Sequence, residues 1–385
     1  MQLDFHYYAT YCAAFIAGYS HRESLDIAYS AQFVDCCTKS FLREVKGPLQ
    51  AATTQSQTEL LGVRTDVIGL QDITRIWASF HFLPGNLYSK VKSFSRAYKN
   101  KYRLICQPNG DLLIRTVELA KGKDLQAVGV SMHVLADTWA HRNFAGTPSM
   151  VINNTDGNFF EILPDDTLRK VKFGHNPGAS DDIETGSYTN TVYNIGETTI
   201  MNLGHGRAGH LPDYSFVRYK YLPAWDDYRE CLKDNPSEYY NAFAQMIYAM
   251  KYLRGETASF EKETYDEISV APYKDRIKEI IGKRQLDSCS DWKAFGEELS
   301  GESIPDFDED HYVKEYKNAD TDHVDKTFLG RFIIAALSQK SMVTNQIYNS
   351  GNRLAGFSID YEKRGFAGIR DYMKLVDNTA GRENG

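Results

Sequence analysis

Possible metal ligands recur at helical spacing near the middle of the chain. His133, Asp137 and His141 lie in the segment HVLADTWAH, with four residues from each to the next. Because an α-helix turns every 3.6 residues, they project from one face, stacked over about two turns. Imidazole nitrogen and carboxylate oxygen are the usual zinc ligands where thiolates are missing. One helix face is therefore predicted to serve two metals, with Asp137 able to bridge them.

A polar cluster in the core is the alternative interpretation of this helix. Val130, Val134 and Trp139 supply an apolar stripe on the same segment. Two histidines and an aspartate on such a stripe would then need other buried partners, because an unpaired buried polar group is costly.

A glycine-rich segment, GHGRAGHLPD at 204–213, is the second candidate site. It holds His205, His210 and Asp213 among three glycines. Glycine lets the backbone turn sharply and approach a ligand closely, although polar glycine-rich turns are also common without a ligand. Spacing does not decide between His205 and His210, so both are candidate metal ligands with Asp213.

Single metal-capable side chains also interrupt three apolar segments. They are His6 in LDFHYYATY, Asp35 in AQFVDCC and His81 in SFHFLPG. Each of them alone is more often structural than catalytic. Buried ionisable groups need a partner, however, and a metal is one possible partner for all three.

Helical patterns dominate the chain. Helices are predicted over 7–19, 23–45, 86–105, 111–120, 124–143, 225–233, 236–254, 271–284, 291–299, 323–349 and 357–377. Residues 49–75 are polar and are predicted to form loop with short strands. Residues 144–204 are rich in Gly, Asn, Thr and Asp, which predicts a small β-containing insertion. The expected architecture is mainly α: a metal-binding helical core over 1–225, which includes that insertion, and a C-terminal helical region over 226–385 packed on it.

Composition limits the class of protein. With 385 residues, of which 42% are hydrophobic, the chain can bury a sizeable core without disulfides. A net charge of −7 disfavours general binding of polyanions by the whole surface. The six cysteines form no CxxC pair, and the start MQLDFHYY does not resemble a signal peptide. We therefore expect a cytoplasmic protein without a transmembrane segment and leave its oligomeric state open.

The order of these candidates resembles a known ligand series. His6, Asp35, His81, His133-x3-Asp137, His141, His205 or His210, and Asp213 follow the order of the zinc-dependent phospholipase C / P1 nuclease superfamily. The resemblance implies a mainly helical phospholipase C/P1 nuclease-like core with zinc ions in a cleft. It implies one ion at Asp35, His81, His133 and Asp137, a second at His141, His210 (or His205) and Asp213, and a third at His6 and the other oxygen of Asp137.

The chain departs from that superfamily at its N-terminus. There the third zinc is bound by the amine and carbonyl of an N-terminal tryptophan, whereas this chain has Met1. Gln2 is large, so we expect Met1 to be retained and its amine to be able to reach a metal, with Asp4 as a candidate substitute. Two or three zinc ions are therefore expected.

A second resemblance covers most of the N-terminal 220 residues. It is to a bacterial family of uncharacterised proteins with FHFLPG, HxxADTxAHxxFxG and GHGxxGHxPD motifs, and it brings no activity with it.

The predicted function is hydrolysis of phosphoester bonds by metal-activated water. A phosphodiesterase, a nuclease and a phospholipase C-like enzyme all fit, with nucleic acid, a nucleotide or a phospholipid headgroup as substrate. Asp137, Arg142 and Arg207 are the candidate catalytic residues, because the two arginines adjoin candidate ligands and suit a substrate phosphate. The alternative is a non-catalytic helical protein in which bound metal holds the helices together and which interacts with a partner.

Overall fold

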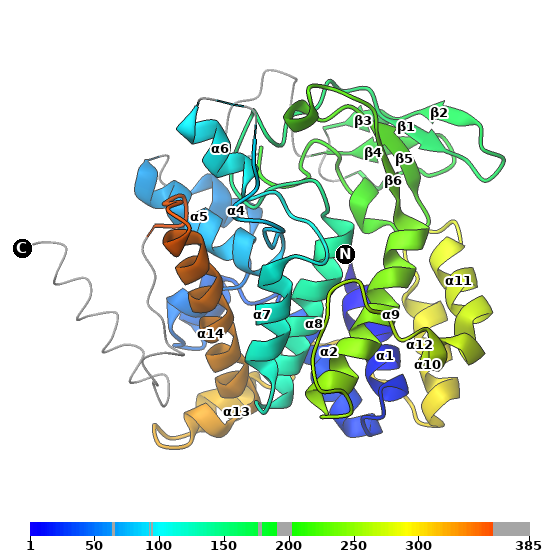
Figure 1. Ribbon diagram of the computed structural model, residues 1–385. Coiled ribbons are helices and arrows are strands. Elements are labelled where there is room, and N and C mark those ends of the chain that lie inside the picture. Colours follow the sequence, from blue (N-terminus) through cyan, green and yellow to red (C-terminus); the bar gives the residue numbers. More distant parts are fainter. Residues whose placement is uncertain (64–65, 92, 94, 176–178, 191–201, 357–385) are drawn as a thin grey trace, which may run out of the picture.

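The computed structural model describes residues 1–63, 66–91, 93, 95–175, 179–190 and 202–356. A helical body carries short strands at one end (Figure 1), which confirms the prediction of a mainly α fold with a small β-containing part. The α-helices are α1 (Thr10–Ile16), α2 (His21–Phe33), α3 (Lys39–Glu44), α4 (Gln57–Leu61), α5 (Val67–Phe80), α6 (Arg96–Tyr102), α7 (Asp111–Ala120), α8 (Leu125–Ala140), α9 (Asn235–Leu253), α10 (Glu267–Val270), α11 (Lys274–Gly282), α12 (Cys289–Ser300), α13 (Val313–Asn318) and α14 (Phe328–Asn349). Shorter turns are the π-helical η1 (Asp4–Ala9) and the 3₁₀ turns η2 (Leu49–Ala51), η3 (Leu211–Asp213), η4 (Ala224–Asp226), η5 (Ala271–Tyr273) and η6 (Val324–Lys326).

The strands form two small sheets. One is a four-stranded antiparallel sheet in the order β2-β1-β5-β6, and the other is a parallel pair of β3 and β4. Their bounds are β1 (Phe160–Ile162), β2 (Leu168–Lys170), β3 (Lys172–Gly174), β4 (Ser187–Thr189), β5 (Arg218–Tyr221) and β6 (Cys231–Asp234). Because β5 and β6 follow residue 204, the sheet joins the predicted insertion to the chain that comes after it.

Helix α8 runs through the centre of the helical body and packs on α2, α7, α9 and α14. Its closest neighbour is α2, and Gly129 permits that approach. A Cβ at Gly129 would lie 2.4 Å from the carbonyl oxygen of Ile27 and 2.5 Å from Cβ of Ser30. Any larger side chain would therefore separate α8, which carries His133 and Asp137, from α2, which precedes Asp35.

The predicted helix over 23–45 is wrong in its middle. Helix α2 ends at Phe33, and α3 begins after Thr38, whose hydroxyl accepts a hydrogen bond from the Phe41 amide. Asp35 therefore lies in the short turn between the two helices. In this turn the Asp35 carboxylate does not follow the apolar stripe of α2; its Oδ1 lies 3.7 Å from His81 Nδ1 and 3.9 Å from His133 Nε2.

Three other predicted segments also differ from the structure. Among the residues that the structure describes, the helix predicted over 86–105 is limited to α6, Arg96–Tyr102. Residues 49–75 include α4 and most of α5, which the polar composition concealed; Asp66 caps α5 by accepting from the Gly69 amide. The helix predicted over 225–233 is instead η4 followed by β6, because pairing with β5 overrides the local helical pattern. The helix predicted over 357–377 lies outside the described residues.

Helices from both sides of residue 225 share one hydrophobic core. Val134 of α8, Phe243 of α9 and Phe332 of α14 all belong to it and are fully buried. A second apolar cluster lies under the sheet and includes Phe144 and Phe159. Within the described residues, no helix combines the length and the apolar character that a membrane crossing requires.

Candidate metal centre

Helix α8 supplies the central strip of the site. His133 and Asp137 lie on the helix, and His141 is its C-terminal capping residue. All three side chains are buried, and that of Asp137 is only 1% exposed. The helical spacing noted in the sequence therefore does place them on one side of α8, facing the N-terminal segment, the turn after α2 and the loop at 204–213.

The first group of ligand atoms surrounds one oxygen of Asp137. Ligand atoms of Asp35, His81 and His133 all lie within 4.8 Å of one another. Asp137 Oδ2 lies 3.2 Å from His81 Nδ1 and 3.2 Å from His133 Nε2. His81 comes from the end of α5 and Asp35 from the turn after α2, so three separate segments meet at this point.

The second group joins the end of α8 to the glycine-rich loop. His141, His205 and Asp213 offer ligand atoms that also lie within 4.8 Å of one another. Asp213 Oδ1 is 3.2 Å from His141 Nε2, and Asp213 Oδ2 is 3.7 Å from His205 Nε2.

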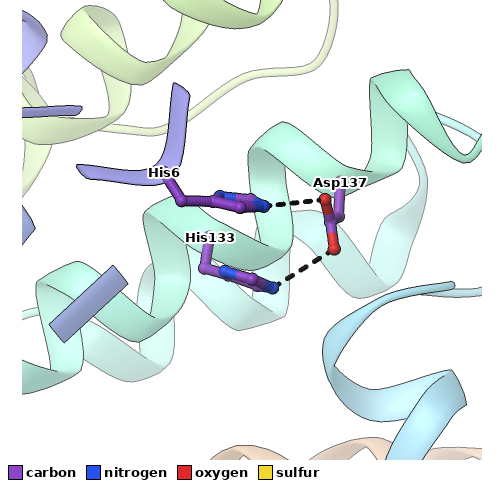
Figure 2. A group of neighbouring side chains, drawn as sticks. All are labelled: His6, His133 and Asp137. Atoms are coloured by element: carbon purple, nitrogen blue, oxygen red, sulfur yellow. Dashed lines mark ion pairs between the residues drawn. The ribbon is translucent and has the colours of Figure 1, made fainter. Parts of the chain in front are cut away.

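The third group lies on the other oxygen of Asp137. Figure 2 shows His6, from the N-terminal segment, and His133 facing the Asp137 carboxylate from the same side. His6 Nε2 is 3.2 Å from Asp137 Oδ1, and the two imidazole rings stack with centroids 3.9 Å apart. The two oxygens of Asp137 thus face different groups, which is the geometry of a bridging carboxylate.

The Met1 amine is buried among the same carboxylates. Its nitrogen lies 2.9 Å from Asp137 Oδ1, 3.2 Å from Asp213 Oδ1 and 3.2 Å from His141 Nε2. Burial acts to lower the pKa of this amine, but the charges of Asp137, Asp213 and Asp35 outweigh burial and raise it to about 11. The protonated amine therefore neutralises part of the negative charge of the cluster.

Backbone carbonyls orient four of the five imidazoles. The contacts are His81 Nε2 to the Thr53 carbonyl (3.0 Å), His133 Nδ1 to Ala31 (2.8 Å), His141 Nδ1 to His81 (2.6 Å) and His205 Nδ1 to Gly209 (2.8 Å). A carbonyl oxygen only accepts, so the nitrogen beside it carries the hydrogen. In the neutral ring the other nitrogen, which faces the cluster, is then a free lone pair. This second layer of contacts is typical of histidines that bind metals.

Burial keeps three of these imidazole rings neutral. Burial lowers the pKa of His6, His133 and His205 to about 4. Burial acts to raise the pKa of Asp137 and Asp213, but the histidines and the Met1 amine around them hold it well below its usual value. Neutral imidazoles and ionised carboxylates are the forms in which these side chains bind metals.

The donor set fits zinc. His133 Nε2 lies 3.3 Å from His81 Nδ1, and both are lone-pair nitrogens in the neutral rings, so they repel unless a cation lies between them. Neither ring nitrogen of His6 has a hydrogen-bond partner among the described residues, although Nε2 is within ion-pair distance of Asp137. Imidazole nitrogens and carboxylate oxygens with no thiolate are a usual zinc set.

Three predicted site residues lie elsewhere. His210 is not in any of the three groups; its Nδ1 lies 3.0 Å from Asp181 Oδ2, so His205 is the histidine of this loop that joins the cluster. Arg207 is buried; its Nε donates to Asn202 Oδ1, and its Nη2 lies 3.2 Å from Met150 Sδ. Arg142 is partly exposed and forms an ion pair with Glu238.

Sequence reasoning did not find Asp181 or Lys233. Asp181 lies in a polar segment of the predicted insertion, and its carboxylate contacts His210. No regular spacing distinguishes Asp181 from the other polar residues of this segment. The buried Lys233 ammonium donates to the carbonyls of Trp139 and Ala140 at the end of α8 and pairs with Glu238. Lys233 lies between Leu232 and Asp234 in a polar segment that was predicted as the end of a helix, so no signal in the sequence marked it as buried.

Comparison with known proteins identifies a family for this chain but assigns no activity to it. Residues 1–347 match the model of a family described as one of unknown function (DUF6765). No curated protein and no solved structure matches the chain. The family model covers the helical body, the small sheets and all of the residues in the three groups.

Proposed function

The chain belongs to this family, DUF6765, and from its metal centre we propose that it is a zinc-dependent hydrolase of phosphoester bonds. The proposal rests on one observation above all. Four imidazoles are oriented by backbone carbonyls so that their lone-pair nitrogens converge on the carboxylates of Asp35, Asp137 and Asp213. Zinc ions held close together act as Lewis acids that activate water and neutralise charge on a phosphoryl group.

The ligand order supports the superfamily named above as the model for this site. The three groups have the composition that a phospholipase C / P1 nuclease-like core implies, with Asp137 between the first and the third. Met1 takes the place of the N-terminal tryptophan, since its amine lies within 3.2 Å of three donor atoms of the cluster. We therefore propose three zinc ions, the third with the Met1 amine, His6 and Asp137.

The ligand sets also suggest where the substrate binds. Asp35, His81, His133 and Asp137 offer four protein donors, whereas His141, His205 and Asp213 offer three side chains. A set of three leaves room for a further ligand, as catalytic zinc sites do. Solvent contacts the cluster at two ligands, Asp35 and His205, whose side chains are 31% and 19% exposed.

A structural role is the second candidate function. The first group has the four donors of a closed structural zinc site, and it joins three separate segments of the fold. In that case zinc would hold the helices together, and no phosphoester would be turned over.

Elemental analysis and an activity panel test both candidates. Purified protein is expected to contain about three equivalents of zinc, and Asp137→Asn with His133→Ala is expected to lose most of it. His323→Ala is the matched control, because that histidine is exposed and lies in none of the groups. The panel comprises nitrophenyl phosphate esters, nucleotides, single-stranded DNA and RNA, and phospholipid. Full zinc content in the double variant refutes the site; zinc without turnover of any ester favours the structural role.

A further inference from the structure

A second polar cluster lies beside the metal centre, outside its three groups. The buried carboxylate of Asp181 accepts from the Thr189 amide (2.6 Å), the Thr189 hydroxyl (2.9 Å) and the Tyr214 hydroxyl (2.7 Å). Its fourth contact is His210 Nδ1 at 3.0 Å. Four contacts use the acceptor capacity of a carboxylate fully, so the position of Asp181 is fixed from four directions.

Asp181 determines which edge of His210 is available. The nitrogen that faces an ionised carboxylate carries the hydrogen, so Nδ1 is committed to Asp181 and Nε2 is the remaining polar atom. The Asp181 side chain is 1% exposed, whereas that of His210 is 51% exposed. Burying a carboxylate is costly, and here the buried carboxylate fixes the orientation of a half-exposed imidazole. Such an arrangement holds a histidine ready for a ligand.

The chain places His210 close to two candidate ligands of the second group, His205 and Asp213. His210 immediately precedes the 3₁₀ turn η3, whose last residue is the candidate ligand Asp213. A 3₁₀ helix has three residues per turn, so side chains three apart lie on the same side. The Asp213 amide donates to the His210 carbonyl at 2.9 Å, and the neighbouring Gly209 carbonyl holds His205.

We propose that His210 is a substrate-contacting residue, whose Nε2 binds a phosphoryl oxygen of the ester held at His141, His205 and Asp213, and that Asp181 is its positioning residue. The inference rests on the proposed function and deepens it. A ring between two anions, the carboxylate and the phosphoryl group, carries both hydrogens and donates one to each. The predicted insertion then has a role, because it supplies Asp181 and Thr189 to the substrate side of the site.

Binding of inorganic phosphate to the zinc-loaded full chain tests the contact without any turnover. His210→Ala is expected to weaken phosphate binding about tenfold, since a hydrogen bond to a charged group is lost. His210→Gln, whose amide can still donate, is expected to recover part of this affinity, and Asp181→Asn is expected to fall between the wild type and His210→Ala. Calorimetry measures the affinities, and elemental analysis measures zinc in every variant.

Kinetics on bis(nitrophenyl) phosphate distinguishes contact from a structural effect. The variants are expected to raise KM more than they lower kcat, with zinc content and melting temperature unchanged. Unchanged phosphate affinity in His210→Ala would overturn the inference, and so would loss of zinc, which would make His210 a metal ligand. If the wild type binds phosphate but hydrolyses no ester, the proposed function fails while the phosphate measurements still decide the role of His210.

Discussion

The amine of Met1 lies 2.9 Å from Asp137 Oδ1, although the two residues are 136 positions apart in the chain. The other oxygen of the same carboxylate faces His81 and His133. One side chain on α8 thus contacts the beginning of the chain, the end of α5 and its own helix. In the proposed metal centre, this relationship makes Asp137 the central ligand, and it would link metal uptake to the protonation state of the N-terminal amine.

The first prediction concerns this amine. With a pKa of about 11, it is protonated in the metal-free protein at neutral pH, so binding zinc through its nitrogen must release a proton. Placing Gly-Ser before Met1 is expected to remove about one zinc equivalent and the associated proton release. Elemental analysis and proton release into weak buffer on zinc addition measure the two effects. Proteolytic removal of the extension should restore both, and an extended protein with full zinc content would contradict the prediction.

The second prediction concerns the contact between α2 and α8. Gly129→Ala would bring a Cβ to 2.4 Å from the Ile27 carbonyl, which forces the helices apart. We expect a loss of about 1–3 kcal/mol in the free energy of unfolding and weaker zinc binding, since Asp35 follows α2 directly. Denaturant unfolding and zinc titration measure these effects. Gly282→Ala in α11 is the matched control, because a Cβ there meets nothing within 4 Å; an equal loss in both variants would refute the explanation.

The third prediction concerns the pH dependence of stability in chelator-treated protein. His6, His133 and His205 have ordinary pKa values of 6.5, lowered to about 4 in the fold. As pH falls from 6.5 to about 4, the unfolded chain therefore binds more protons than the folded one, and the folded state loses stability. Urea unfolding across this window should show decreasing midpoints. A flat profile in the wild type, or the same profile in His133→Ala, would contradict the assignment.

The fourth prediction concerns the end of α8. Lys233 donates to two carbonyls there and pairs with Glu238, and all of these groups are buried. Lys233→Met leaves Glu238 buried with only the partly exposed Arg142 as its ion-pair partner, so we expect about 3 kcal/mol of destabilisation. Adding Glu238→Gln should recover part of this loss, because the uncompensated charge is removed. Thermal unfolding of the single and double variants measures the coupling; equal losses in both would show that the carbonyl contacts dominate.

Much of the candidate site could be predicted because it depends on residues that lie close together in the sequence. The spacing of His133, Asp137 and His141 fixes their common side as soon as the segment is helical. Apolar surroundings marked His6 and His81 as groups that need a partner. The alternation of helical and polar segments likewise predicted a mainly α fold with a small β-containing part.

Other features depend on contacts between distant segments. Spacing did not decide between His205 and His210, and the ligand order put His210 first. The tertiary structure separates them: the Gly209 carbonyl orients His205 toward the cluster, and Asp181 binds His210. The helix predicted at 225–233 became β6 because β5 was there to pair with it.

The sequence by itself thus determined the ligand types and their order, because ligand chemistry belongs to each side chain and helical spacing to one segment. Only the tertiary structure decided which atoms meet. The approach of α2 to α8 at Gly129, the turn that releases Asp35 and the burial of the Met1 amine all arise from packing between segments that are far apart in the chain. Packing of this kind depends on the whole core and cannot be derived from any one motif.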